Sequence, residues 1–144
     1  MRMTADRFDL ERFVEAQQGI YARVCAELRE GCKRSHWMWF IFPQMRGLGS
    51  SPTAQRFGIS CADEARSYLR HLILGARLRE CTQYLMQIEG RTATEIFGHP
   101  DELKFRSCMT LFARTTEEPL FQSALQKYFA GESDALTLDL LEAA

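Results

Sequence analysis

Ser35-His-Trp-Met-Trp-Phe-Ile-Phe-Pro43 is the stretch on which the fold depends, because every residue from Trp37 onward is apolar. Such a run is typical of a buried turn of helix and also of a buried central strand, and periodicity alone does not separate the two. Ser35 is a suitable N-cap and the flanking segments are helical in pattern, which favours a short buried helix, with a central strand as the alternative. Pro43 ends the element in either case, since proline has no N–H to donate and restricts the residue before it.

On both sides of this stretch, apolar residues recur at spacings of three and four, the pattern of amphipathic helices. Upstream, one helix is expected from Asp9, which can cap it, to Gly31, which can end it. Downstream, two glycines and a proline predict a loop over Gln44–Pro52. The helical segments expected after the loop are one turn over Thr53–Phe57, a helix from Ser60 or Asp63 to Gly90 with a bend at Gly75, a short helix with a capping box at Thr92 and Glu95, and helices over Asp101–Arg114, Pro119–Gly131 and Asp134–Leu141.

These segments predict an all-α fold, a compact single domain over residues 1–144 with about six helices joined by short loops and no regular bundle. A chain of 144 residues fits one ordinary domain. Its 46% hydrophobic and 26% charged residues are the balance of a globular protein. Residues 1–8 are expected to form a loosely ordered tail.

Charge and cysteine content narrow the classes of function. Eighteen basic and nineteen acidic residues leave a net charge of −1, which argues against a nucleic-acid binder. Five cysteines without a Cys-x-x-Cys pair predict reduced thiols, and the three histidines lack metal-ligand spacing. No apolar stretch is long enough to span a membrane or to form a signal core. We therefore expect a cytoplasmic protein with no metal site and no membrane partner, and no motif identifies a cofactor.

The segment from Lys33 to Ser51 carries the groups that a small-molecule site needs, namely rings for stacking, fixed donors and cations for a phosphate. The alternative is a core helix whose aromatic side chains only fill volume. The loop after it lacks the third glycine of a dinucleotide fingerprint, since Pro52 stands there, so a plain turn is favoured over a phosphate cradle. The predicted binding residues of this segment are Lys33, His36, Trp37, Trp39, Gln44, Arg46, Gly47 and Gly49.

Lys104 and Ser107 lie three residues apart on the helix predicted after Pro100, and hence on neighbouring positions of one face. A desolvated lysine beside a serine can act as base and nucleophile. The commoner interpretation is a paired lysine and a serine bonded to its own helix. We therefore predict ligand contacts for both residues and assign no catalytic role.

Motifs over nearly the whole chain, from Phe8 to Leu141, resemble those of a known family. The motifs are Lys33-Arg-Ser-His-Trp-Met-Trp-Phe-Ile-Phe-Pro-Gln44, Gly47-Leu-Gly49, Phe57-Gly-Ile59, Glu64–Leu69, Leu74–Leu78, Ile96-Phe-Gly98, Asp101–Lys104, Ser107–Phe112, Tyr128–Gly131 and Asp134–Leu138. Together they resemble the bacterial domain-of-unknown-function family numbered 1810. The resemblance implies a compact, mainly helical fold and no assigned reaction, and nothing in the sequence supports the calpastatin label that some relatives carry. Where a His-Pro pair is expected, this chain has His71-Leu72.

Two hypotheses about function follow. The first is a domain that binds a small phosphate-bearing or nucleotide-like molecule, with a site on the Lys33–Ser51 segment and the Lys104 helix; whether it is also an enzyme is left open. The alternative is a non-enzymatic protein–protein interaction module, which includes a self-associating homo-oligomer. An interaction groove predicts Trp and Phe side chains open to solvent, whereas a core predicts them buried.

Overall fold

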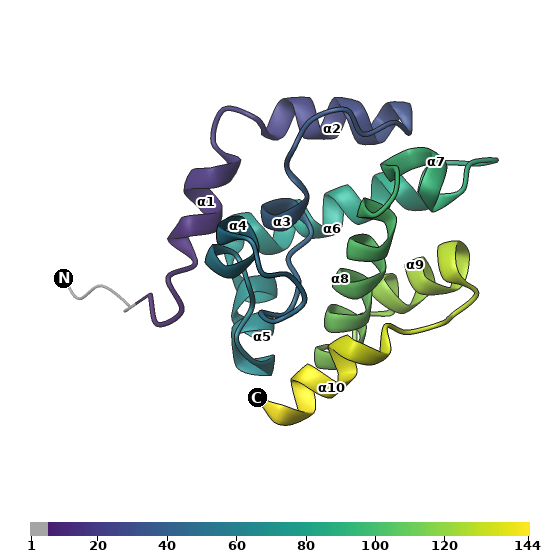
Figure 1. Ribbon diagram of the computed structural model, residues 1–144. Coiled ribbons are helices and arrows are strands. Elements are labelled where there is room, and N and C mark those ends of the chain that lie inside the picture. Colours follow the sequence, from purple (N-terminus) through teal and green to yellow (C-terminus); the bar gives the residue numbers. More distant parts are fainter. Residues whose placement is uncertain (1–5) are drawn as a thin grey trace.

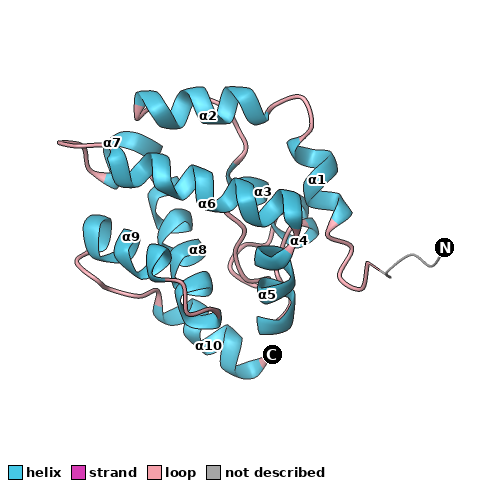
Figure 2. Cartoon of the chain, turned by 180° about the vertical axis from the view of Figure 1, so that it is seen from behind, coloured by secondary structure: helices cyan, strands magenta, loops and turns pink. Residues whose placement is uncertain are grey.

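The structure is a computed structural model that describes residues 6–144. Ten helices and no strand occur in this part of the chain (Figures 1 and 2). The all-α prediction is therefore confirmed, with more helices than the six or so expected. The helices are α1 (Glu11–Gln17), α2 (Tyr21–Glu30), α3 (Met38–Ile41), α4 (Pro52–Arg56), α5 (Ala62–Arg70), α6 (Leu72–Gln87), α7 (Ala93–Phe97), α8 (Asp101–Thr115), α9 (Pro119–Phe129) and α10 (Ala135–Ala143).

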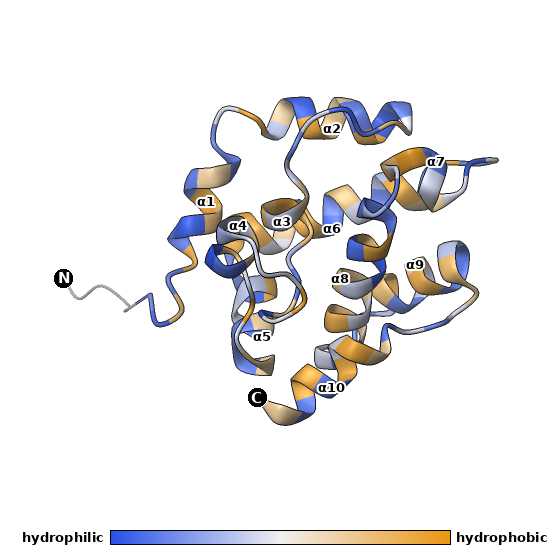
Figure 3. Cartoon of the chain, in the orientation of Figure 1, coloured by the Kyte–Doolittle hydropathy of each residue, from blue (hydrophilic) through white to orange (hydrophobic). Residues whose placement is uncertain are grey.

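Helices α6 and α8 are central to the packing. Helix α6 packs against α1, α2, α5 and α9, and α8 packs against α3, α5, α7, α9 and α10. Hydrophobic and hydrophilic residues alternate along the ribbons, as expected of helices with one buried face (Figure 3). One continuous core results, and its largest buried side chains include Trp37, Tyr68, Phe105 and Phe112.

Several predicted helix ends are confirmed. Thr92 and Glu95 form the reciprocal capping box at the start of α7, in which each side chain accepts a hydrogen bond from the other residue's N–H. Pro119 is the first residue of α9. The carboxylate of Asp134 caps α10 by accepting the N–H of Thr137 (3.1 Å).

The single helix predicted from Asp9 to Gly31 is wrong, because the chain forms two helices there. Gly19 separates α1 from α2 with a φ of 76°, in the left-handed region that favours glycine. Asp9 does not cap α1. The carboxylate of Asp6 instead accepts the N–H groups of Leu10 (2.7 Å) and of Glu11 (2.9 Å), where the helix begins. Gly31 ends α2 in a left-handed conformation, as predicted.

The buried guanidinium of Arg12 ties the N-terminal segment to the body of the protein. It donates to the carbonyl oxygen of Phe8 and forms an ion pair with Glu64 (2.8 Å), and both charged side chains are buried. Of the tail expected over residues 1–8, residues 1–5 lie outside the described part of the chain. Phe8 packs against the core.

The bend predicted at Gly75 lies at His71 instead. The imidazole Nδ1 of His71 accepts hydrogen bonds from two N–H groups in the first turn of α6 (3.1 and 3.2 Å), and so caps that helix. Gly75 lies inside α6, where a Cβ would come within 2.1 Å of the carbonyl oxygen of Leu69. Glycine is therefore needed at that position because α5 and α6 approach each other closely.

The apolar stretch Ser35–Pro43 contains the short helix α3, so the helical interpretation of this stretch is confirmed over the strand. Ser35 does not cap α3; its hydroxyl donates to the carboxylate of Glu27 on α2. Trp37 precedes the helix and is only 1% exposed. The helix ends before Pro43.

Glu27 fixes the position of this stretch. Its buried carboxylate accepts hydrogen bonds from the N–H groups of Arg34 (2.8 Å) and Ser35 (3.1 Å), from the Ser35 hydroxyl, and from the indole Nε1 of Trp37 (2.9 Å). Burial by itself raises the pKa of Glu27. The hydrogen bonds from Ser35, Arg34 and Trp37 outweigh burial and lower that pKa from 4.5 to about 2.

Replacing Glu27 by Gln should destabilise the protein by roughly 3 kcal/mol at neutral pH, because charge-assisted hydrogen bonds are lost and an amide group faces four donors. The contribution of the ionised carboxylate is complete above the unfolded pKa of 4.5 and declines as the pH falls toward about 2. Urea unfolding across this pH range should therefore show the two stability curves converging. If the two stability curves stay parallel, the stabilising role of the ionised Glu27 carboxylate is contradicted. The control is Glu30→Gln, at an exposed position on the same helix, which should change stability little.

Replacing Leu72 by Pro should stabilise the protein by about 0.4–1 kcal/mol, seen as a higher thermal midpoint. Leu72 is 91% exposed and begins α6, where proline is favoured. His71 already has the extended backbone (φ −64°, ψ 132°) that a residue before proline prefers. The matched control is Ile73→Pro, which removes an N–H that His71 accepts and should destabilise. A lower thermal midpoint in the Leu72→Pro protein would count against this description of the junction between α5 and α6.

Candidate functional site

Four of the predicted residues line one cavity of about 290 Å³, namely His36, Trp37, Trp39 and Lys104. The cavity is formed by α3 with the residues before it, the start of α4 and the first turn of α8. Segments far apart in the sequence therefore meet there. Its volume is close to the lower limit of roughly 300 Å³ that is usual for ligand sites, so it is large enough for a single ring system. The other lining residues are Met38, Phe40, Ser51, Thr53 and Asp101.

Asp101 joins two of the predicted cations. Its carboxylate lies 2.8 Å from the Nζ of Lys33 and 3.1 Å from the Nζ of Lys104. Burial raises the pKa of Asp101, but hydrogen bonds from the two lysines and their charges outweigh burial and hold that pKa below its ordinary value. One carboxylate is thus shared by two ammonium groups, which leaves the cluster with a net positive charge.

The two lysines differ in access to solvent. The side chain of Lys33 is 6% exposed, and its Nζ also donates to the carbonyl oxygen of Ser35 (2.6 Å). The side chain of Lys104 is 28% exposed and its Nζ lies 5.2 Å from the centre of the Trp39 ring. Lys33 is therefore a buried anchor for Asp101, whereas Lys104 lies at the cavity.

The two indoles also differ. Trp37 is buried and bonded to Glu27. Trp39 is half-buried, and its N–H has no hydrogen-bond partner among residues 6–144. Gly49 lies against the Trp39 ring, because a Cβ at this glycine would come within 2.9 Å of a ring carbon. Gly49 thereby allows the loop before α4 to close over the ring.

Four predicted loop residues are absent from the lining of this cavity. Gly49 lies against the Trp39 ring, and the other three lie elsewhere. Gln44 is 1% exposed and its amide Nε2 is buried without a hydrogen-bond partner. Arg46 is exposed and donates to the carbonyl oxygen of Gly58 (3.2 Å). Gly47 faces α10, where a Cβ would come within 3.2 Å of Leu140.

Ser107 also lies apart from the cavity. Its hydroxyl is bonded within α8 to the carbonyl oxygen of Leu103 (3.1 Å) and across to the carboxylate of Asp134 (3.1 Å). Lys104 turns toward Asp101 and Trp39, so the lysine and the serine have different partners. The structure brings no nucleophile and base together at these two positions.

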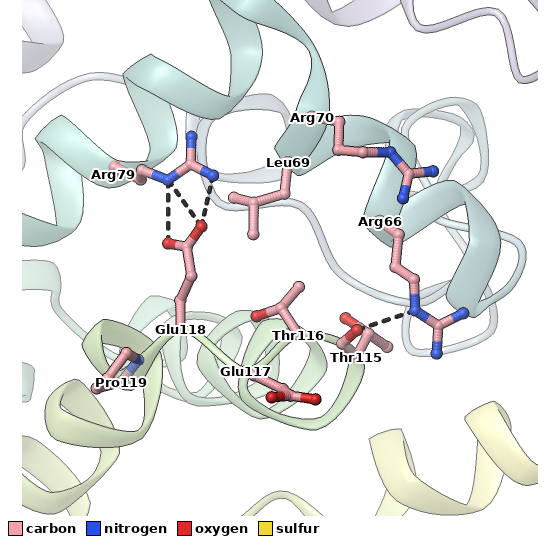
Figure 4. Close-up of a pocket in the computed structure, with 9 residues that line it drawn as sticks. All are labelled: Arg66, Leu69, Arg70, Arg79, Thr115, Thr116, Glu117, Glu118 and Pro119. Carbon is pink, nitrogen blue, oxygen red and sulfur yellow. Dashed lines mark hydrogen bonds and ion pairs between the residues drawn. The ribbon is translucent and has the colours of Figure 1, made fainter.

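A larger cavity, of about 610 Å³, lies between α5, α6 and the turn from α8 to α9 (Figure 4). Sequence reasoning did not identify it. The available signal was the pair Arg66 and Arg70, which are four residues apart on a predicted helix and therefore share a face. Its lining residues are Arg66, Leu69, Arg70, Arg79, Thr115, Thr116, Glu117, Glu118 and Pro119.

No helix within residues 6–144 combines the length and the apolar character that crossing a membrane requires. Over the same residues, no three His, Cys, Asp or Glu side chains are grouped so as to hold a metal ion. The five cysteines are free thiols, and Cys108 is fully buried in the core.

A family model described as "Protein of unknown function (DUF1810)" matches residues 7–141. Among solved structures, the chain is similar to the conserved hypothetical protein Rv1873 from Mycobacterium tuberculosis. The two are 55% identical with a TM-score of 0.95, over 96% of this chain and 100% of that one. A comparison with curated proteins finds no match. The family resemblance inferred from the motifs is confirmed, and the protein belongs to the DUF1810 family of proteins of unknown function.

Proposed function

We propose that the protein binds a small phosphate-bearing or nucleotide-like molecule in the cavity between α3, α4 and α8. The observation that carries the proposal is the meeting of Trp39 with the Lys33–Asp101–Lys104 cluster. A stacking surface and an incompletely neutralised cation thus occupy one cavity. Sites for planar anionic ligands need both parts.

Trp39 supplies the surface for the ring of the ligand. Its half-buried indole offers a face for stacking, and its N–H is free to donate to a ring heteroatom. Gly49 lets the loop before α4 pack directly against this indole, and that contact restricts the movement of the ring. A preorganised aromatic surface lowers the entropic cost of binding.

Lys104 supplies the charge. Because Asp101 is shared with the buried Lys33, an anionic group can pair with Lys104 while Asp101 keeps its other partner. The exposed side chain of His36 lies at the same cavity and offers a further donor. A phosphate would take the Lys104 side of the cavity and the ring the Trp39 side.

The burial of the aromatic residues favours a small-molecule site over an open aromatic groove. The large hydrophobic side chains that are exposed among residues 6–144 are all aliphatic. They are Leu72, Ile73, Leu103 and Leu136. A groove that captures a partner through Trp and Phe would need those rings at the surface.

A thermal-shift screen against nucleotides, dinucleotides, ADP-ribose and sugar phosphates tests the proposal. A ligand at a hundred times its dissociation constant adds about 2.7 kcal/mol of stability, which corresponds to a shift of several degrees. Lys104→Ala should abolish the shift, because the ligand's anion loses its partner. Arg23→Ala, which removes an exposed charge on α2, should leave it unchanged. No stabilisation by any compound, or an equal loss in both variants, would refute the proposal.

A further inference from the structure

The larger cavity has a cationic wall built from two helices. Arg66 and Arg70 extend from α5, and Arg79 extends from α6. Figure 4 shows Arg66 and Arg70 on one side of the cavity, Arg79 on the other side, and Leu69 between them. The opposite wall is the turn that joins α8 to α9.

Arg79 is already paired with an anion of the protein itself. Its Nε lies 3.0 Å from each carboxylate oxygen of Glu118, and its Nη2 also donates to that carboxylate. The pair joins α6 to the start of α9 and cancels one positive charge of the wall. The Arg79–Glu118 pair also illustrates the kind of group that an arginine of this wall binds, which is an anion that offers it two oxygens.

Arg66 and Arg70 have no comparable partner. The Nε of Arg66 donates to the carbonyl oxygen of Thr115 (3.0 Å), which fixes the side chain against the cavity, and its Nη1 forms an exposed pair with Asp63 (3.2 Å). Arg70 forms no hydrogen bond or ion pair with residues 6–144. Glu117 also lines the cavity, but it is exposed and forms no ion pair with either arginine in the described part of the chain. Two like charges four residues apart on one helix repel each other. A ligand with two negative charges placed between them would relieve that repulsion.

The rest of the cavity favours an organic ligand over a bare ion. Leu69 and Pro119 give it apolar surface, and its volume of about 610 Å³ is well above that of a phosphate group alone. Guanidinium groups match the oxygens of a phosphate in geometry, and a phosphomonoester carries a charge of about −1.5 to −2 at neutral pH. A monocarboxylate would satisfy only one of the two arginines.

We propose that this cavity is a second binding site, which takes a phosphomonoester with an apolar substituent. The phosphoryl group lies between the guanidinium groups of Arg66 and Arg70, and the substituent lies on Leu69 and Pro119. This cavity shares no lining residue with the cavity of Trp39 and Lys104, so the two proposed sites can be tested independently.

Titration of the full chain with phenyl phosphate, followed by calorimetry and by NMR of the backbone amides, tests the proposal. Binding should shift the amides of Leu69, Thr115 and Thr116. It should be stronger than binding of inorganic phosphate, which lacks the apolar part, and of benzoate, which carries one charge. Arg70→Ala should weaken it about tenfold or more, the loss expected for a charge-assisted hydrogen bond, while Arg70→Lys, which keeps the charge but not the planar fork, should lose less.

Arg23→Ala is the matched control and should bind phenyl phosphate as the unchanged protein does. In Lys104→Ala, which removes the charge of the first site, the amide shifts of Leu69, Thr115 and Thr116 should persist. Arg70 is exposed, so its replacement should leave the circular dichroism spectrum unaltered. The inference is overturned if the unchanged protein does not bind phenyl phosphate, or if Arg23→Ala weakens binding as much as Arg70→Ala. It is also overturned if the amides near Trp39 shift and only Lys104→Ala loses binding; that result would support the first site instead.

Discussion

The buried carboxylate of Glu27 is the interaction on which the rest of the structure depends. It accepts hydrogen bonds from Arg34, Ser35 and Trp37, and so turns the chain from α2 into α3. A buried charge is tolerated only when its lone pairs are well satisfied, and here backbone and side-chain donors meet that demand. The segment held in this way also carries Lys33, whose ion pair with Asp101 reaches the first turn of α8. A continuous line of polar contacts thus runs from α2 to α8 along the edge of the aromatic core.

Much of the helical structure could be predicted because the signals are local. The capping box at Thr92, the proline that begins α9 and the aspartate before α10 each act within one turn of the chain. The break at Gly19 was missed because the apolar spacing continues across it. The corner at His71 and the glycine at position 75 were misassigned because the reason lies in the contact between α5 and α6, which no local pattern contains.

The candidate site, too, could be predicted from the sequence only in part. The spacing of aromatic and basic residues pointed to His36, Trp39 and Lys104, and these line one cavity. Three residues of an α-helix turn by about 300°, so Ser107 is rotated by about 60° from Lys104 and instead faces Asp134. Asp101, the partner shared by both lysines, was missed because only the folded chain brings α8 to Lys33. The arginine-lined cavity was missed for the same reason, since it exists only between packed helices.

The different surroundings of the two tryptophans have a spectroscopic consequence. Trp37 is enclosed and bonded to a carboxylate, whereas Trp39 is half-exposed beside an ammonium group. The intrinsic fluorescence of the protein is therefore the sum of two emitters in unlike environments. The emission of Trp37 reports whether the core is intact, and that of Trp39 responds to changes at the cavity it lines, so the chain contains an optical probe for each.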